Sequence, residues 1–460
     1  MSIRSLAALS WALFAAACSS GPDYSRPQPP SRSAGAFLAA ERSAVDPLAL
    51  VPAGWWKLFD DPVLDRLIAD ALAANTDVRV ALGRLEQARA ALREVKVDRL
   101  PQGGAAAGAA YGRPDSGSGA GARYDLGLEV AYEADLFGRV KRGVEAARSD
   151  LAAASHDADA VRVTIAAETA RAYADAAAAA ERLAVARRIV ELLARSLRLT
   201  ERRVEIGTTL RIDSARIATL LHQRRAEIPS IMAERDSALF RLAMLTGRVP
   251  ADLPPDAATR TSSLRLERPI PVGDGAQLIA RRADVRAAER RLAAATARIG
   301  VATADLYPRI RLGGLIGASG AIGNFLGNPV AWLLGPLIDW SFSDHGRARA
   351  RVAGAEAGTK VALAQFDGAV LRALQETETA LSAYANALRR REALQVARAE
   401  AEVAARIVRA QQREGQVDSL ALLDAERTFA ETEAELADMN GRVAAAQIDL
   451  FRALGGAWNG

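Results

Sequence analysis

The chain has 460 residues, of which half are apolar, a quarter are charged and only 5% are aromatic. This balance indicates a folded, helix-rich protein and argues against wholesale disorder. The net charge of +5 is the difference between 60 basic and 55 acidic residues. These charges lie in mixed-sign runs, which excludes the concentrated basic patch of a nucleic-acid-binding protein.

The N-terminus has the features of a lipoprotein signal. Arg4 precedes an apolar run, residues 6–17, which is too short to span a bilayer and suits the core of a signal peptide. Small residues then lead into Cys18, the only cysteine, so no intrachain disulfide can form. We expect residues 1–17 to be removed and a diacylglyceryl lipid to be attached to Cys18. An ordinary signal peptide with an incidental cysteine is the alternative.

The rest of the chain shows an internal duplication. Residues 76–79 (TDVR) recur as residues 283–286 (ADVR), an offset of 207 residues, and Gly207 has a counterpart in Gly415 at an offset of 208. An extended, Pro-rich segment covers residues 18–60, and a second Pro-rich stretch separates the two halves. The sequence therefore predicts a first repeat over 61–248, a linker over 249–273 and a second repeat over 274–460.

Each repeat is predicted to contain the same elements in the same order. The first begins with a helix and continues with a β-hairpin at about 101–137, a long helix over 139–206 and a helix over 209–247. The second begins with a helix and continues with a β-hairpin at about 308–343, a long helix over 347–414 and a helix over 417–455.

The first long helix is too long for an ordinary globular core. Residues 144–206 contain no Gly or Pro, and 63 helical residues span roughly 95 Å. Apolar residues follow two adjacent lines with alternating spacings of three and four, one through Leu183 and Leu193 and one through Val185 and Ile189. Two such seams allow a helix to pack against a partner on each side, as the wall of a tube requires. A long coiled-coil hairpin is the alternative.

The β-hairpins show the period-two pattern of membrane strands. In three of the four strands apolar residues alternate with polar or small ones, and aromatic residues stand near the strand ends, as in a membrane-interface girdle. The first strand, residues 102–112, is nearly all Gly and Ala and shows no alternation, so it is placed by symmetry with the second repeat. The residues predicted to face lipid are Tyr124, Leu126, Leu128, Val130, Tyr132, Trp332, Leu334 and Trp340. The alternative is a soluble domain with four amphipathic strands.

Four strands cannot close a barrel, and open sheet edges are not tolerated in lipid. If the strands are membranous, the chain must therefore oligomerise. Two copies would supply eight strands and three would supply twelve, and sequence spacing alone does not choose between them.

At residues 281–312 the chain reads RRADVRAAERRLAAATARIGVATADLYPRIRL. This run resembles the signature of the TolC-like outer-membrane efflux proteins, most closely their lipoprotein (NodT/OprM-type) branch. Segments 21–30 (GPDYSRPQPP), 133–139 (EADLFGR), 415–429 (GQVDSLALLDAERTF) and 450–458 (LFRALGGAW) agree with it. The family usually has proline at the position of Ala283.

The resemblance implies a mainly α protein with a membrane β-barrel portion. Three copies would form a twelve-strand barrel continuous with a twelve-helix periplasmic α-barrel. Each copy would be the outer-membrane channel subunit of a tripartite efflux pump, a passive duct for small molecules rather than an enzyme. Its implied partners are a periplasmic adaptor protein and an inner-membrane pump, usually of the proton-driven RND type.

The resemblance also places functional residues at the helical hairpin turns. The expected adaptor contacts are Gly207, Thr208, Thr209, Leu210, Gly415, Gln416, Val417 and Ser419. Asp424 falls where relatives carry an acidic gate residue, and three copies would form a ring of carboxylates that attracts cations. Some relatives carry a second acid at the position of Ala421. A solvated helix carboxylate is the alternative for Asp424.

Nothing else in the sequence predicts a cofactor or catalytic site. The three histidines, His156, His222 and His345, lack the spacing of metal ligands, and no nucleophile, base and orienting residue form a set. Two other functions fit less well. One is an outlet for type I protein secretion, and the other is a periplasmic coiled-coil adaptor or scaffold lipoprotein.

Overall fold

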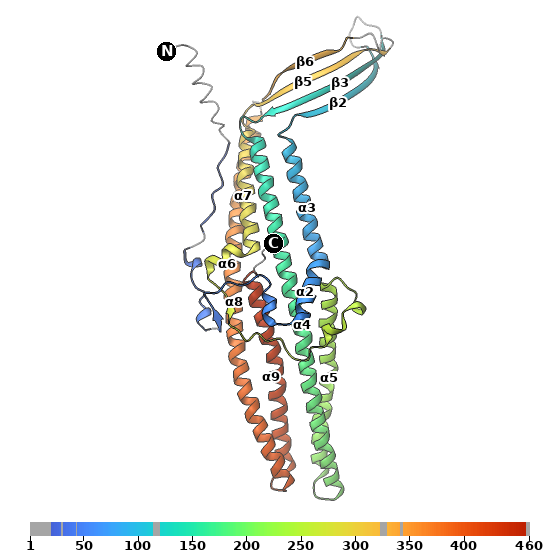
Figure 1. Ribbon diagram of the computed structural model, residues 1–460, viewed down its shortest axis with the longest axis vertical. Coiled ribbons are helices and arrows are strands. Elements are labelled where there is room, and N and C mark those ends of the chain that lie inside the picture. Colours follow the sequence, from blue (N-terminus) through green and yellow to red (C-terminus); the bar gives the residue numbers. More distant parts are fainter. Residues whose placement is uncertain are drawn as a thin grey trace. The chain divides into compact units, whose positions relative to one another are not determined.

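The computed structural model describes residues 20–28, 31–42, 44–113, 120–322, 329–340 and 344–456 (Figure 1). The predicted signal peptide and Cys18 lie outside these residues, and the side chain of Ser419 is also outside the description. Among the described helices, none combines the length and the hydropathy needed to cross a membrane.

The same six elements occur twice along the chain. The first set is α2 (Pro62–Ala74), α3 (Thr76–Val97), β2 (Gln102–Gly112), β3 (Gly121–Ala134), α4 (Arg139–Glu205) and α5 (Arg211–Leu245). The second set is α6 (Gly275–Arg281), α7 (Ala283–Ala304), β5 (Arg309–Ala321), β6 (Ala331–Asp339), α8 (His345–Arg413) and α9 (Ser419–Ala453). Two short strands, β1 (Val45–Asp46) and β4 (Ile270–Pro271), pair in parallel.

The chain forms two compact units that cut across the repeats. Unit 1 comprises Met1–Gln28, Gly83–His156 and Ala287–Gly368, and unit 2 comprises Pro29–Leu82, Asp157–Arg286 and Ala369–Gly460. Each unit takes segments from both halves of the sequence. A single repeat is therefore not a compact unit by itself.

Unit 1 contains an antiparallel four-stranded sheet in the order β2-β3-β5-β6 (Figure 1). The register aligns the apolar positions of neighbouring strands. Leu128 of β3 lies opposite Ile316 of β5, and Ile316 lies opposite Trp332 of β6. Because side chains alternate between faces along a strand, the apolar residues of these three strands share one face.

Strand β2 consists almost entirely of glycine and alanine, and its neighbour explains why. Gly104 and Gly108 lie opposite Glu129 and Asp125 of β3. A Cβ on Gly108 would lie 2.6 Å from a carboxylate oxygen of Asp125, and a Cβ on Gly104 would lie 3.0 Å from one of Glu129. The two carboxylates thus lie across β2, which leaves space only for glycine at these two positions.

The N-terminal segment of unit 1 is held against α4 and α7. The Ser20 amide donates to the carbonyl of Phe137 at 3.1 Å. The buried Arg142 guanidinium donates to the carbonyl oxygens of Ser20 and Gly21 and to the Asp23 carboxylate. Gly21 crosses Gly300 so closely that a Cβ on either residue would meet backbone atoms at 2.6 Å.

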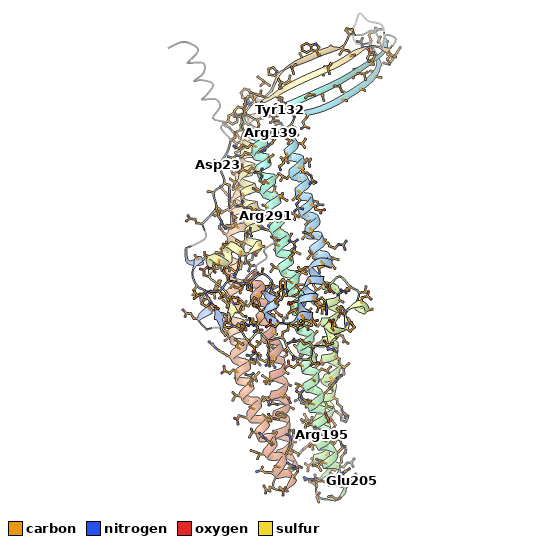
Figure 2. The ribbon with its side chains drawn as sticks, viewed as in Figure 1. Asp23, Tyr132, Arg139, Arg195, Glu205 and Arg291 are labelled. Carbon is orange, nitrogen blue, oxygen red and sulfur yellow. The ribbon has the colours of Figure 1, made fainter. Side chains whose placement is uncertain are left out.

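A second contact holds the same segment a few residues further on. The Tyr24 hydroxyl donates to Glu289 of α7 at 3.1 Å, and burial together with the Glu289 charge raises the pKa of Tyr24 to about 12. A segment expected only to be extended is therefore fixed by hydrogen bonds and ion pairs. Figure 2 labels Asp23, which belongs to this segment.

Unit 2 contains two long helical hairpins, α4–α5 and α8–α9, and the short elements that pack beside them (Figure 1). Trp55, in a 3-10 helix (Trp55–Phe59), stacks on Phe451 of α9 with ring centroids 4.7 Å apart. Trp55 and Phe451 are both fully buried. The aromatic pair therefore anchors the segment that precedes α2 onto the last helix.

A buried aspartate joins three elements of unit 2. One carboxylate oxygen of Asp61 caps α2 by accepting from the amides of Val63 and Leu64. The other accepts from the Tyr173 hydroxyl of α4 at 3.0 Å and from Arg260 at 2.8 Å. Burial and the Asp61 charge raise the pKa of Tyr173, which keeps its hydroxyl protonated as the donor.

We expect Asp61→Ala to lower the free energy of unfolding by about 2–4 kcal/mol, because it removes a helix cap and leaves the buried Tyr173 hydroxyl without its acceptor. Thermal unfolding followed by circular dichroism in detergent measures the change. Asp60→Asn is the matched control. Asp60 is exposed, and its ion pair with Arg268 is long, at 3.7 Å. Equal melting temperatures for the two variants would contradict this account of Asp61.

Candidate functional site

The apolar face of the sheet is open to its surroundings in the single chain. Trp332 is 75% exposed and Leu128 is 58% exposed, and these are large apolar side chains. The other exposed members predicted from the sequence are Leu126, Val130, Tyr132, Leu334 and Trp340. Such an extended exposed apolar surface marks contact with a membrane or another protein.

Tyr124 departs from this pattern. It is 6% exposed, although it belongs to the same face of β3 as Leu126 and Leu128. Its cross-strand neighbours are Ala109 and Gly320, and such small residues leave room for a ring to lie against the sheet. Tyr124 is therefore buried in the single chain, and its lipid-facing position in the barrel stays a prediction.

The opposite face of the sheet carries the charged residues. Arg311 of β5 contacts Asp339 of β6 at 3.2 Å. Arg139, the first residue of α4 and labelled in Figure 2, donates two hydrogen bonds to the carboxylate of Glu133 of β3, at 2.8 and 2.6 Å. These pairs link neighbouring strands and join the sheet to the start of the long helix.

This charged face also carries three leucines that the sequence reading missed. Leu315, Leu333 and Leu337 are exposed, and the register places them on the same face as Glu129 and Arg311. Leu337 lies over Gly313, where a Cβ would be 2.6 Å from a leucine methyl carbon. The sequence of β6 is apolar at nearly every position. Its pattern therefore does not distinguish the leucines of this face from the apolar residues of the opposite face.

The two hairpins of unit 2 turn at glycines with left-handed backbone conformation. Gly207 has φ of 76° and Gly415 has φ of 72°. In both turns the residue after the glycine donates its amide to a carbonyl five residues earlier, from Thr208 to Arg203 and from Gln416 to Gln411. This is the Schellman ending of a helix, and it reverses the chain within a few residues.

The two turns differ in how the returning helix begins. Asp418 caps α9 by accepting from the amide of Ala421 at 2.8 Å. Leu210, at the start of α5, makes no side-chain capping bond. Ile206 and Leu210 are both more than 70% exposed, so the α4–α5 turn presents an apolar surface. Glu205, which ends α4, marks this turn in Figure 2.

Asp424 lies on an exposed part of α9, one turn beyond the helix start. Its carboxylate forms no ion pair with another residue that the structure describes. Its neighbour Glu426 is buried and accepts two hydrogen bonds from Arg409 of α8, at 2.5 and 2.8 Å. Asp424 therefore stands next to the contact that holds the end of the α8–α9 hairpin together.

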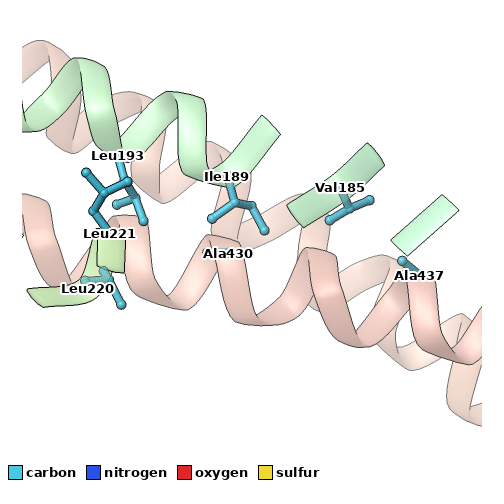
Figure 3. Close-up of a cluster of buried hydrophobic side chains, with 7 residues drawn as sticks. All are labelled: Val185, Ile189, Leu193, Leu220, Leu221, Ala430 and Ala437. Atoms are coloured by element: carbon cyan, nitrogen blue, oxygen red, sulfur yellow. The ribbon is translucent and has the colours of Figure 1, made fainter. Parts of the chain in front are cut away.

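Several contacts join the two hairpins to each other. Arg203 of α4 donates to the Gln412 carbonyl of α8 at 3.2 Å, and Arg188 of α4 contacts Glu433 of α9 at 3.2 Å. A buried apolar cluster packs between α4, α5 and α9 (Figure 3). Its members are Val185, Ile189 and Leu193 of α4, Leu220 and Leu221 of α5, and Ala430 and Ala437 of α9. Both predicted seams of α4 therefore contribute to intrachain packing, one through Leu193 and the other through Val185 and Ile189.

Among the described residues, no group of His, Cys, Asp or Glu is arranged to hold a metal ion. Unit 2 does have a hollow of about 660 Å³, which is open to solvent. Its lining includes Arg171, which is bound to Asp449, and Arg282, which is bound to Glu376. Each of these two arginines is therefore already paired with a carboxylate.

Replacing Glu426 by Gln is expected to destabilise the closed α8–α9 end by about 1–2 kcal/mol. The reason is that a neutral amide accepts weaker hydrogen bonds from the Arg409 guanidinium than a carboxylate does. Hydrogen exchange of the amides in residues 405–430 should then be faster. The control is Glu191→Gln, which alters an exposed pair with Arg195 in α4. If both variants exchange at the wild-type rate in this segment, the Arg409–Glu426 contact does not hold the tip.

Comparisons with known proteins agree with this architecture. A model of the family described as outer membrane efflux protein matches residues 67–248 and 275–456. The outer membrane protein OprJ of Pseudomonas aeruginosa is 34% identical over 467 residues, with 99% of this chain and 96% of that protein covered.

Solved structures show the same fold. The outer-membrane channel OprN superposes with a TM-score of 0.89 at 36% identity, covering 96% of this chain and 100% of OprN. The open state of the MtrE outer membrane channel of Neisseria gonorrhoeae gives a TM-score of 0.81 at 29% identity, covering 96% of this chain and 98% of MtrE.

Proposed function

Because the chain belongs to the outer membrane efflux protein family, we propose that it is the outer-membrane channel subunit of an efflux pump. The resemblance and the fold class predicted from the sequence are confirmed by the family match and by the likeness to OprN. The family consists of channels, so the activity is passage through a duct and involves no covalent chemistry.

One observation carries the proposal most strongly. The apolar face of the sheet runs without interruption across β3, β5 and β6, and it is exposed in the single chain. The opposite face carries the charged residues, including Arg311, Asp125 and Glu129. A sheet that is apolar on one face and charged on the other fits a barrel with lipid outside and water inside.

The barrel requires several copies of the chain. One copy supplies four strands, and the outer edges of β2 and β6 have no partner strand among the described residues. In the assembly that we propose, three copies contribute twelve strands. Their α4, α5, α8 and α9 helices then form a twelve-helix tube in the periplasm, continuous with the barrel.

The lipid anchor at Cys18 belongs to the same proposal. Ser20 is fixed to the Phe137 carbonyl, close to the end of β3. Cys18 is two residues away, and two residues span at most roughly 7 Å. A lipid on Cys18 would therefore insert beside the barrel at the membrane surface, where the sheet gives way to α4.

The hairpin turns are the proposed contact surfaces for a periplasmic adaptor protein. The residues are Gly207, Thr208, Thr209 and Leu210 in one turn, and Gly415, Gln416, Val417 and Ser419 in the other. The exposure of Ile206 and Leu210 supports this role, since apolar side chains at a solvent-exposed turn favour burial in a partner. An inner-membrane pump of the RND type would complete the assembly and select the cargo.

Leu333 and Leu334 allow a direct test of the barrel, because adjacent residues of β6 face opposite sides. A lipid-soluble thiol probe should label Leu334→Cys and leave Leu333→Cys unlabelled. An arginine at position 334 should cost about 2–4 kcal/mol near the bilayer midplane, whereas an arginine at 333 should be tolerated. Equal labelling of the two cysteines would remove the lipid-facing assignment and the channel proposal with it.

Asp424 is the proposed gate residue, because it lies at the tip beside the Arg409–Glu426 contact. Replacing Asp424 by Ala should raise single-channel conductance and reduce cation preference in planar bilayers, since a ring of three carboxylates is lost. Asp424→Glu keeps the charge and should retain the cation preference of the wild type. Unchanged conductance and selectivity in Asp424→Ala would exclude Asp424 from the gate.

A further inference from the structure

Helix α8 carries an apolar seam that no other part of the described chain covers. Val396, Val403 and Ile407 lie on one side of the helix and are 61%, 41% and 51% exposed. Ala399 and Ala410 belong to the same seam, whose successive spacings are three, four, four and three, and are also exposed. The neighbouring side of α8 is different, because Ala401 and Ala405 are buried against Phe429 of α9.

Helix α5 carries a second uncovered seam. Five exposed residues of this helix follow one another at intervals of seven, and they are Ile212, Thr219, Ala226, Ala233 and Phe240. Met244, four residues after Phe240, extends the seam and is exposed. In contrast, Ile217, Leu220 and Leu221 of the same helix are buried inside the hairpin pair. A seam with heptad spacing is the surface that a helix presents to a coiled-coil partner.

The relative heights of α5 and α8 along unit 2 follow from contacts with α9, which packs beside both. Arg224 of α5 contacts Glu431 of α9 at 3.4 Å. Arg398 of α8 contacts Glu433 of α9 at 3.9 Å. Residues near 225 of α5 therefore lie at the height of residues near 400 of α8. The two helices run in opposite directions. Residue numbers therefore fall along α8 in the direction in which they rise along α5.

At matching heights the two seams have complementary side-chain sizes. Val396, Val403 and Ile407 of α8 fall at the heights of residues 229, 222 and 218 of α5, where the α5 seam carries the small residues Thr219 and Ala226. Further from the turns the relation reverses. The large residues Phe240 and Met244 of α5 fall at the heights of Asn386 and Ser382 of α8, which are both exposed.

The charged residues beside the seams are also complementary. On α5 they are Arg211, Arg225 and Asp236. At the same heights, to within one residue, stand Glu414, which directly follows the end of α8, and Glu400 and Arg390 of α8. The first three residues are 14 and 11 positions apart, and the second three are 14 and 10 positions apart. All six are exposed, and none forms an ion pair with another residue in the part of the chain that the structure describes.

We propose that the α5 seam of one copy packs antiparallel against the α8 seam of the next copy, with Arg225 opposite Glu400 and Arg211 opposite Glu414. The two seams are different surfaces, so the contact is head-to-tail, and repetition of it closes a ring. Rotation about the axis of a tube leaves heights unchanged, so heights measured within one chain apply between copies. This inference rests on the proposed function, because it takes the ring of copies from the channel assembly.

The experiment uses cysteine pairs in the full-length chain, in membranes, with a short bismaleimide cross-linker. The matched variants are Arg225→Cys with Glu400→Cys and Arg211→Cys with Glu414→Cys. The mismatched controls exchange partners, as Arg225→Cys with Glu414→Cys and Arg211→Cys with Glu400→Cys. They use the same four positions, but the exchanged partners are separated by 14 helical residues, or roughly 21 Å. The unaltered chain, with Cys18 as its only cysteine, provides the background.

The matched pairs should give covalent dimers and higher species, and the mismatched pairs should give only the background. Cross-linking in all four variants, or in none, would overturn the seam pairing. If none cross-links while native mass measurement still shows a trimer, only the pairing is wrong and the channel proposal stands. If the chain is a monomer in membranes, the pairing and the proposed channel both fail.

Charge exchange gives an independent readout of the same contact. Arg225→Glu should lower the yield of assembled trimer by roughly two- to fivefold, in keeping with the modest strength of exposed ion pairs. Glu400→Arg should do the same, and the double variant should recover the wild-type yield. A double variant as poor as either single variant would show that these two residues do not meet.

Discussion

The sheet of unit 1 ends in two strands, β2 and β6, whose outer backbone groups lack a partner strand among the described residues. In hydrocarbon each unsatisfied N–H or C=O group costs several kcal/mol. A sheet with an apolar outer face can therefore enter the membrane only if other copies cover both edges. The composition of β2 suits this position, because its glycines and alanines allow close approach of a neighbouring strand. In the proposed assembly, oligomerisation is thus a consequence of hydrogen bonding, and the symmetry of the helical tube follows from it.

In the proposed assembly, unit 2 meets a different requirement, since its helices join copies to one another and reach the adaptor at the turns. Buried contacts such as Arg409–Glu426 and the cluster around Ile189 hold the four helices of one copy together. The surfaces left over are the turns and the two uncovered seams. The turns differ in capping and apolar character, so the proposed adaptor would contact them in different ways. In this view, stability comes from contacts within each copy, and assembly and gating come from the weaker contacts between copies.

Much of the architecture follows from sequence periodicity, and the exceptions have physical reasons. Long Gly-free helices and alternating strands can be recognised because the periods of 3.5 and 2 are local properties. Strand β2 lacks alternation because Asp125 and Glu129 of another strand occupy the space above Gly108 and Gly104. The clasp between Arg142 and residues 20–23 joins segments more than 100 positions apart, and no local pattern predicts it. Among the candidate site residues, the glycine turns follow from local rules, whereas the role of Asp424 depends on resemblance alone.

The central claim is that the strands of one chain complete their hydrogen bonding only by sharing a barrel with other copies. Native mass spectrometry of the full-length protein, released from membranes in mild detergent, tests it most directly. The account predicts a single species with three chains, which separates into monomers only when the sheet unfolds. A folded monomer with its β-hairpins intact and inserted in lipid would contradict it.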